Sequence, residues 1–201
     1  LDSTPQSIFY MFNNADIRFE SVTDRQGNEI GISHGRFVPL LESSDRDLRR
    51  KVFQSYYRSF DQYKNTVAAI FAANLKKELF YTKARHYASS MEAHLSQNNI
   101  PTTVYDQLIE AVHDALPEMY RYVRLRRKML GVEELHMYDV YTPLVSGEHA
   151  SIPFDEAMEI VSRGLAPLGE SYIQLLNEGM HGGWIDRYEN KGKRTGAYSG
   201  G

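Results

Sequence analysis

The segment from Ser44 to Ile100 contains neither glycine nor proline. These two residues interrupt helices more strongly than any others, so their absence over such a length predicts one or two long helices. The apolar and aromatic residues support this prediction, because a four-residue spacing places side chains on one face of a helix. The residues with this spacing are Leu48, Val52, Tyr56 and Phe60.

Local signals mark where this helical segment begins and divides. Ser44 and Asp47 have the spacing of a capping box, with Asp in place of the usual Glu, so the first helix is expected to begin there. A break between helices is expected near Phe60–Asp61 or within residues 87–90.

The residues before Ser44 predict a short helix, a β-hairpin and a loop. Residues 3–5, Ser-Thr-Pro, supply an N-cap for a helix that is expected to end near residues 13–14. Residues 23–28 are polar and include a glycine, a composition typical of a turn. This predicts a β-hairpin over residues 17–32, with the turn between its two strands. A loop containing Gly35 and Pro39 is expected next.

A third long helical pattern follows Ile100. It is expected to run to the stop signal Gly131, with Pro117 either kinking it or marking a junction between two helices. Residues 135–145 are apolar, aromatic and contain a proline, so extended structure or a packed loop is expected there.

Two shorter helices and a β segment are expected at the end of the chain. The helices are predicted to end near Gly164 and Met180, and residues 184–201 are predicted to form strand, turn and strand. The whole pattern predicts a mainly α fold, with a small β-hairpin near the N-terminus and a short β segment at the C-terminus.

Charge and composition exclude several classes of partner. With 23 Lys and Arg against 26 Asp and Glu, the net charge of −3 argues against nucleic acid and anionic membranes as partners. No run of eighteen apolar residues exists, so no membrane span is expected. The chain has no cysteine, which excludes disulfides and a cysteine nucleophile and favours a reducing, cytoplasmic location.

The histidines argue against a metal site within these residues. Zinc hydrolases use two histidines four residues apart on one helix, with a glutamate beside the first as general base. None of the seven histidines is followed by another at that spacing. Two weaker combinations, His136 with Asp139 and His113 with Asp114, are interpreted as surface or hydrogen-bonded residues. We therefore expect no metal ligand and no catalytic residue in this sequence.

Two other catalytic motifs fail near the C-terminus. A phosphate-binding loop needs a glycine five positions before Gly192–Lys193, where Arg187 stands. A G-x-S-x-G turn, which presents a serine nucleophile, would need a glycine two residues before Ser199, and no glycine stands there.

The run Gly196, Ala197, Tyr198 and Ser199 places small residues around one aromatic ring. Such a composition allows another backbone to approach closely, and an edge strand can hold an extended peptide by main-chain hydrogen bonds. These four residues are the predicted substrate-binding site. An ordinary edge strand or a glycine-rich tail remains an open alternative.

The sequence from Trp184 to Ser199 fits the pattern W-x-D-x-x-x-N-x-G-K-R-x-G-A-Y-S, and it resembles the oligoendopeptidase F branch of the M3 metallopeptidases. Further segments resemble this branch in the same order: residues 48–53, 84–87, 100–105 and 130–139. The resemblance therefore extends over nearly the whole chain.

The resemblance implies a bundle of long helices in a two-lobed, zincin-like peptidase shell around a channel that admits short peptides. Residues 1–41 would end an accessory N-terminal domain, and residues 42–201 would be the first, incomplete part of the catalytic domain. The complete enzyme would use Zn, with the HExxH helix and other ligands beyond Gly201. Exposed tyrosines such as Tyr56, Tyr57 and Tyr63 could then touch peptides, although core packing is favoured for each.

The expected activity is zinc-dependent hydrolysis of oligopeptides by the complete protein. The 201 residues alone would be inactive, and would need the missing C-terminal part of the same protein as a partner. Two alternatives stay open: a non-catalytic helical module that binds peptides or proteins, and a helical assembly unit that folds by itself.

Overall fold

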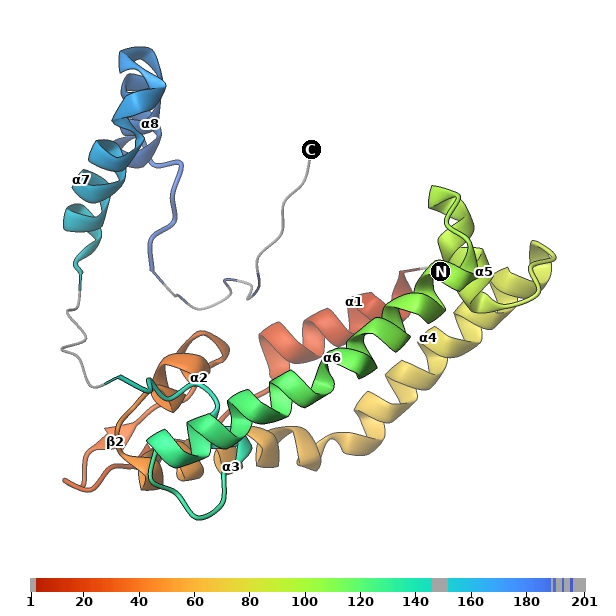
Figure 1. The fold of residues 1–201 in the computed structure, drawn as a ribbon, viewed down its shortest axis with the longest axis horizontal. Helices are drawn as coiled ribbons and strands as arrows, with labels where there is room; N and C mark the ends of the chain where they lie inside the picture. The colour runs from red at the N-terminus through yellow and green to blue at the C-terminus, as the bar shows by residue number, and fades with distance from the viewer. Residues whose placement is uncertain (1–2, 146–151, 189, 191–192, 194–195, 197–201) are drawn as a thin grey trace. The chain divides into compact units, whose positions relative to one another are not determined.

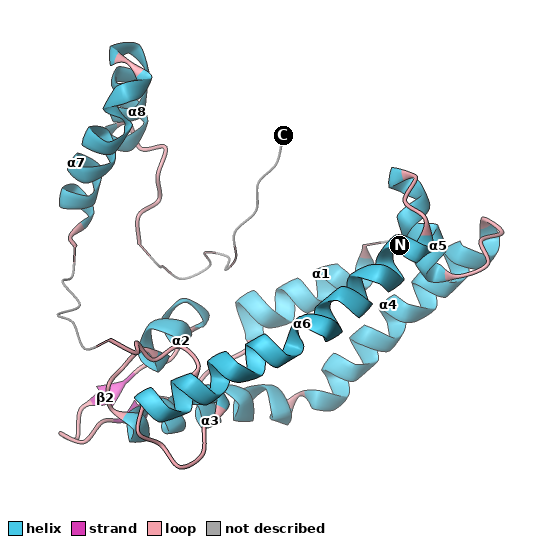
Figure 2. Cartoon of the chain, in the orientation of Figure 1, coloured by secondary structure: helices cyan, strands magenta, loops and turns pink. Residues whose placement is uncertain are grey.

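The computed structural model describes residues 3–145, 152–188, 190, 193 and 196. The chain divides into two units, one built from Leu1–Leu144 with Arg194–Gly201 and the other from Val145–Lys193, and each is considered by itself. Helices dominate both units, as Figure 2 shows in cyan, so the prediction of a mainly α fold is confirmed.

The first unit contains six α-helices, a two-stranded sheet and three short helical turns among its described residues (Figure 1). Its elements in chain order are α1 (Thr4–Met11), the π-helical turn η1 (Phe12–Asp16), β1 (Val22–Thr23), β2 (Glu29–Ile30), α2 (His34–Leu41), α3 (Arg46–Gln62), α4 (Lys64–Ala84), α5 (Ser90–Leu95), the 3-10 turn η2 (Ser96–Asn98), α6 (Thr102–Met129) and the 3-10 turn η3 (Met137–Asp139).

The predicted β-hairpin is confirmed. Strands β1 and β2 pair antiparallel, with Val22 opposite Ile30. The Asp24 carboxylate organises the turn by accepting hydrogen bonds from the backbone N–H groups of Gln26 and Asn28 at 2.9 and 2.8 Å. Gly27 adopts a φ of +86°, a conformation that disfavours residues with a Cβ atom.

The loop predicted around Gly35 and Pro39 is wrong, because this segment forms helix α2. The Ser33 side chain caps the helix by accepting a hydrogen bond from the Arg36 N–H at 3.2 Å. Leu41 at the end of the helix is buried. The helix is short enough that Pro39 removes little of its hydrogen bonding, and burial of its apolar side chains outweighs the unfavourable helix propensities.

The long helical segment divides where sequence signals suggested. Helices α3 and α4 meet at Tyr63, close to the break expected at Phe60–Asp61, and α4 ends before His86, which has a φ of +60°. The cap of α3 is Asp45 and not Ser44, because the Asp45 carboxylate accepts hydrogen bonds from the first turn.

Helix α6 continues past Pro117, so the structure contains no junction there. The helix ends at Met129, and Gly131 follows with a φ of +64°, which confirms the predicted stop signal. None of the described helices combines the length and the apolar composition needed to cross a bilayer.

The core of the first unit lies between the hairpin, α2 and α3. Ile32, Leu41 and Val52 are buried at its centre. Aromatic and aliphatic side chains surround them: Phe19, Val22, Phe37, Leu40, Leu48, Phe53, Tyr56 and Tyr138. The boundary expected after Leu41 stays a prediction, and residues on both sides of it share this core.

The second unit is a pair of helices with a short turn between them. Helix α7 (Phe154–Leu165) packs against α8 (Glu170–His181), and the 3-10 turn η4 (Ala166–Leu168) connects them. The two predicted helices in this region are confirmed. The described residues between Trp184 and Gly196 adopt no strand, and Ala197, Tyr198 and Ser199 of the predicted β segment lie outside the described residues.

Candidate functional site

The predicted substrate segment begins at Gly196, which is exposed and has a φ of +107°. This conformation favours glycine, so the motif glycine meets a backbone requirement at this position. The other predicted site residues, Ala197, Tyr198 and Ser199, lie outside the described residues. The geometry described next is that of the earlier motif residues 184–188, 190 and 193, named here the motif loop.

The motif loop begins with a contact between Trp184 and helix α8. A Cβ atom placed on Gly179 would lie 2.6 Å from Cε3 of Trp184, closer than real side-chain carbons approach one another. Gly179 is buried, whereas Trp184 as a whole is 68% exposed. One face of the ring therefore lies on the helix backbone, and only glycine at position 179 permits this approach.

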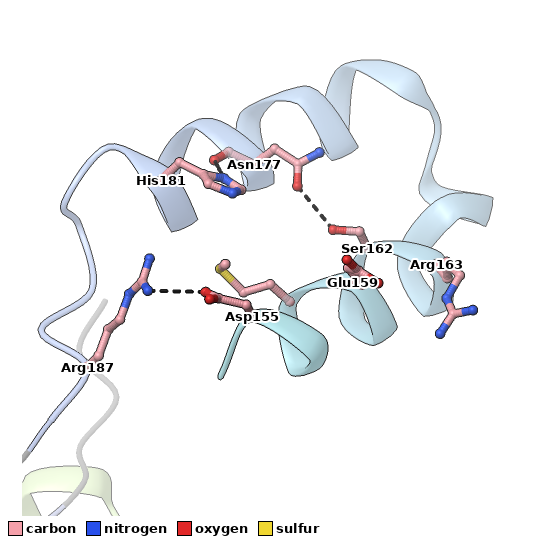
Figure 3. A pocket seen from close by; sticks show the side chains of 8 residues that line it. Asp155, Glu159, Ser162, Arg163, Asn177, His181 and Arg187 are labelled. Atoms are coloured by element: carbon pink, nitrogen blue, oxygen red, sulfur yellow. Dashed lines mark hydrogen bonds and ion pairs between the residues drawn. The ribbon is translucent and has the colours of Figure 1, made fainter. Parts of the chain in front are cut away.

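Arg187 attaches the motif loop to the start of helix α7. Its guanidinium Nη1 lies 3.3 Å from Asp155 Oδ1 (Figure 3). Its Cζ lies 4.4 Å from the centroid of the Phe154 ring. Because the Asp155 side chain is largely exposed, the ion pair alone contributes little stability. The cation–π contact adds a second anchor for the same side chain.

Lys193 closes the motif loop on itself. Its Nζ donates hydrogen bonds to the backbone oxygens of Asp186 at 2.5 Å and Tyr188 at 3.0 Å, and it pairs with the Asp186 carboxylate at 3.2 Å. The Asn190 side chain also donates to Asp186, at 3.4 Å. Three residues of the sequence motif, Asp186, Asn190 and Lys193, are thus linked by hydrogen bonds and an ion pair.

A groove of about 690 Å³, lined by Met158 and by several polar side chains, lies between α7 and α8, beside Arg187 (Figure 3). His181 donates a hydrogen bond from Nδ1 to the backbone oxygen of Asn177 at 2.8 Å, because a carbonyl can only accept. Ser162 donates from its hydroxyl to Asn177 Oδ1 at 3.1 Å. Since an amide oxygen is not a base that removes a proton, this arrangement does not activate Ser162 as a nucleophile.

The family resemblance implies a zinc ion, and the described residues do not fit one. No group of three or more His, Asp or Glu side chains within them is placed to hold a metal. His136 and Asp139 lie close in sequence, but the Asp139 carboxylate is occupied by two arginines and by the backbone N–H of His136. No chemical step is therefore derived through a metal.

Asp139 forms a buried charge cluster with α3. Its carboxylate is fully buried and lies 2.7 Å from Arg49 Nη2 and 3.0 Å from Arg46 Nη2. Burial alone would raise the pKa of Asp139, but the hydrogen bonds from Arg46, Arg49 and the backbone N–H of His136 outweigh it and lower the pKa to about 2. The cluster is a structural anchor, because arginines saturate the carboxylate and no open face remains for a ligand.

Arg126 connects the end of α6 to the same region. Its buried Nη2 donates to the backbone oxygens of Asp139 at 2.8 Å and Thr142 at 2.5 Å. The segment at 135–145, expected to be extended or a packed loop, is therefore a loop with one 3-10 turn that arginines from two helices hold in place.

The three tyrosines that were expected to touch peptides or pack in the core differ in their surroundings. Tyr56 is in the core, stacked on Phe37 and Phe19 with ring centroids 4.0 and 4.6 Å apart. Tyr57 and Tyr63 are 50% and 41% exposed. Core packing is confirmed for Tyr56.

Comparison with known proteins places the chain among peptidases. The family model described as "Peptidase family M3" matches residues 39–201. Oligopeptidase PepF of Bacillus subtilis is 47% identical over 96% of this chain and 29% of its own length. Group B oligopeptidase PepB of Streptococcus agalactiae is 42% identical over 96% of this chain and 32% of its own length.

A solved structure has the same fold. The crystal structure of oligoendopeptidase-F from Enterococcus faecium matches with a TM-score of 0.70 and 38% identity, over 89% of this chain and 33% of that chain. The chain thus spans about a third of the length of the relatives that it matches.

Proposed function

Because the chain belongs to peptidase family M3, we propose that it is part of a zinc-dependent endopeptidase that hydrolyses short oligopeptides. The observation that carries this proposal is the similarity to oligopeptidases over nearly the whole chain. The zinc ligands and the general base would lie outside these residues, in the remainder of a longer protein. We place the enzyme in the cytoplasm, since the chain has no cysteine.

Within that enzyme, we assign residues Gly196 to Ser199 to main-chain pairing with an extended substrate. Motif residues that precede this segment in the sequence support the assignment, because Trp184, Arg187 and Lys193 each make defined contacts. A substrate-binding segment benefits from such preorganisation, since less conformational entropy is lost when the peptide binds. The long helices would form part of the channel wall.

The first experiment measures activity and metal dependence of the full-length protein. Quenched-fluorescent peptides of increasing length would be incubated with enzyme, with enzyme treated with a chelator, and with treated enzyme resupplied with Zn²⁺. We expect cleavage of short peptides, loss of activity with the chelator and recovery with zinc. A folded protein that contains the same cleavable sequence serves as the control and should stay intact.

A second experiment tests main-chain pairing. Peptides N-methylated at single positions lose one backbone donor, and loss of a hydrogen bond should lower kcat/KM by about three- to tenfold at paired positions. Changing only the side chain at the same position should have a smaller effect. Equal effects of methylation at every position would contradict the assigned pairing.

The alternative function is a peptide- or protein-binding module without catalysis. It is favoured by one observation, the lack of a metal-binding group among the described residues. A full-length protein that binds peptides, contains no stoichiometric zinc and cleaves nothing would establish this alternative in place of the peptidase.

A further inference from the structure

Helix α6 presents a long apolar surface to solvent. Near its start it packs against α5, and near its end Arg126 ties it to the loop after η3. Between these points Leu116 is half-buried, and most other large apolar side chains are exposed, among them Val104, Tyr105, Leu108, Ile109, Val112, Met119, Tyr120 and Val123. A helix this exposed gains little of the tertiary packing that supplies most helical stability in proteins.

The exposed side chains lie on one side of the helix. Val104, Leu108, Val112, Met119 and Val123 are separated by four, four, seven and four residues, which places them on one side of the helix, named here the α6 apolar face. At 100° per residue, Glu110, Asp114 and Arg121 project from the opposite side. The sequence of α6 therefore has the pattern of a helix with one side buried and one side in water.

Elsewhere in the described residues, many apolar side chains are also exposed to solvent. Only eight apolar side chains among the described residues are buried: Pro5, Phe12, Ile17, Ile32, Leu41, Val52, Met158 and Met180. Phe71, Leu75 and Leu79, which share one face of α4, are exposed. Leaving so many apolar groups in water costs free energy comparable with the net stability of a typical domain, so these faces require a permanent partner.

We propose that the α6 apolar face packs permanently against the part of the same polypeptide that corresponds to the unmatched two thirds of the M3 relatives. The inference rests on the proposed function in one respect, that the chain is part of a longer peptidase. The relatives are about three times as long as the matched region, so they contain enough additional chain to cover the face.

The dimensions of the face favour this occupant. Helix α6 has 28 residues, which at 1.5 Å per residue gives a length of about 42 Å. A short peptide would cover a fraction of that length and would leave the face bare between binding events. A covering segment in the same polypeptide does not lose the translational and rotational entropy that a separate partner would lose.

The absence of cysteine in the 201 residues makes thiol labelling a direct test. Leu108→Cys places a thiol on the α6 apolar face, and Gln107→Cys, the matched control, places one at the adjacent position on the other side of the helix. Both variants would be made in the full-length protein and treated with a maleimide under native conditions and after unfolding. The parent protein supplies the background from any cysteine elsewhere in the sequence.

We expect native labelling of the Leu108→Cys variant to be at least about tenfold slower than that of the Gln107→Cys variant, and equal labelling after unfolding. The protection should be independent of protein concentration and of added peptide. Equal native labelling would overturn the proposal. Protection that appears only on dimerisation, or only with added peptide, would also overturn it and would identify a second copy or the substrate as the occupant.

Thiol labelling does not depend on catalysis, so the result is separate from the proposed activity. An inactive full-length protein whose thiol at position 108 is protected would contradict the peptidase proposal alone. An active enzyme whose thiol at position 108 reacts freely would contradict the packing proposal alone. A gene product without further sequence would also overturn the packing proposal.

Discussion

Trp184 lies against Gly179 so closely that a Cβ atom on residue 179 would stand 2.6 Å from the indole Cε3. The contact joins the buried side of α8 to the first residue of the motif loop. A glycine in the last turns of a helix is usually unfavourable, and here the close approach of an aromatic ring compensates for it.

Replacing Gly179 with alanine should displace Trp184. Overpacking of this kind costs about 1–3 kcal/mol, and the ring or the helix must move to relieve the clash. The displacement can be measured by fluorine NMR of the full-length protein labelled with fluorotryptophan, with the Trp184 signal assigned from Trp184→Phe. We expect the signal to shift and the melting temperature to fall.

Gly164→Ala is the matched control for this substitution. Gly164 is also helical, in α7, but a Cβ atom there meets no other atom within 4 Å. Alanine should therefore be neutral or should stabilise the helix by up to about 1 kcal/mol. If both alanine variants left the Trp184 signal unchanged, the close contact would not exist in solution.

Arg49 and Arg50 offer a comparison between a buried and an exposed arginine. Arg49 is 3% exposed and pairs with Asp139, whereas the side chain of Arg50 is 52% exposed and pairs with Asp47. Arg49→Ala should destabilise the region by about 3 kcal/mol, because it removes a partner of a buried charge. Arg50→Ala should cost less than about 1 kcal/mol. Hydrogen exchange of peptides from α3 measures both, and similar effects would contradict the difference in burial.

The lowered pKa of Asp139 predicts an acid dependence of stability. The pKa of this carboxyl is about 2 in the folded protein and 3.8 in its ordinary state. The ionised form therefore stabilises the fold above about pH 4, and this contribution is lost as the pH falls from about 4 to 2. At about 1.36 kcal/mol per pKa unit the contribution is about 2 kcal/mol.

The Asp139→Asn variant isolates this effect, because the asparagine side chain cannot ionise. We expect the difference in unfolding free energy between the parent and the variant to shrink by about 2 kcal/mol between about pH 5 and pH 2, as measured by urea denaturation. Parallel pH profiles would show that Asp139 does not contribute through its ionisation.

Lys193→Gln should loosen the motif loop. The glutamine lacks the charge and the reach to replace the contacts of Lys193 Nζ with the backbone oxygens of Asp186 and Tyr188. We expect faster proteolytic cleavage between residues 184 and 196 and, under the proposed function, a higher KM with a smaller change in kcat. Lys64→Gln is the control, because Lys64 forms an exposed pair with Asp61 elsewhere in the chain. A change in kcat alone would argue against a positioning role for Lys193.

The sequence was sufficient to predict the hairpin and every described helix except α2, because these elements depend on local signals. Gly27 has a positive φ in the hairpin turn and Gly131 follows the end of α6, as their positions in the sequence indicated. Helix α2 was missed because Gly35 and Pro39 argue against a helix locally. Its stability comes from tertiary contacts such as the stacking of Phe37 on Tyr56, which no local pattern reveals.

The candidate site was predictable as a motif but not as a set of contacts. The spacing of Asp186, Asn190 and Lys193 belongs to the family pattern, yet their mutual hydrogen bonds follow only from the course of the loop. The buried cluster at Asp139 was missed, although a signal existed. Arg49 lies three residues before Val52, on the apolar face of α3, and a charge at such a position needs a buried partner.

The pair formed by Arg49 and Asp139 joins residues 90 positions apart, and the intervening chain contains α4, α5 and α6. The chain between them therefore leaves the core and returns to it, and the ion pair of Arg49 with Asp139 holds its two ends together. Chain continuity within the segment is then not needed to keep the two ends together. A cut at the exposed turn around Asn99, before α6 begins, should give two pieces that remain associated. They should separate only when the region around Arg49 and Asp139 unfolds.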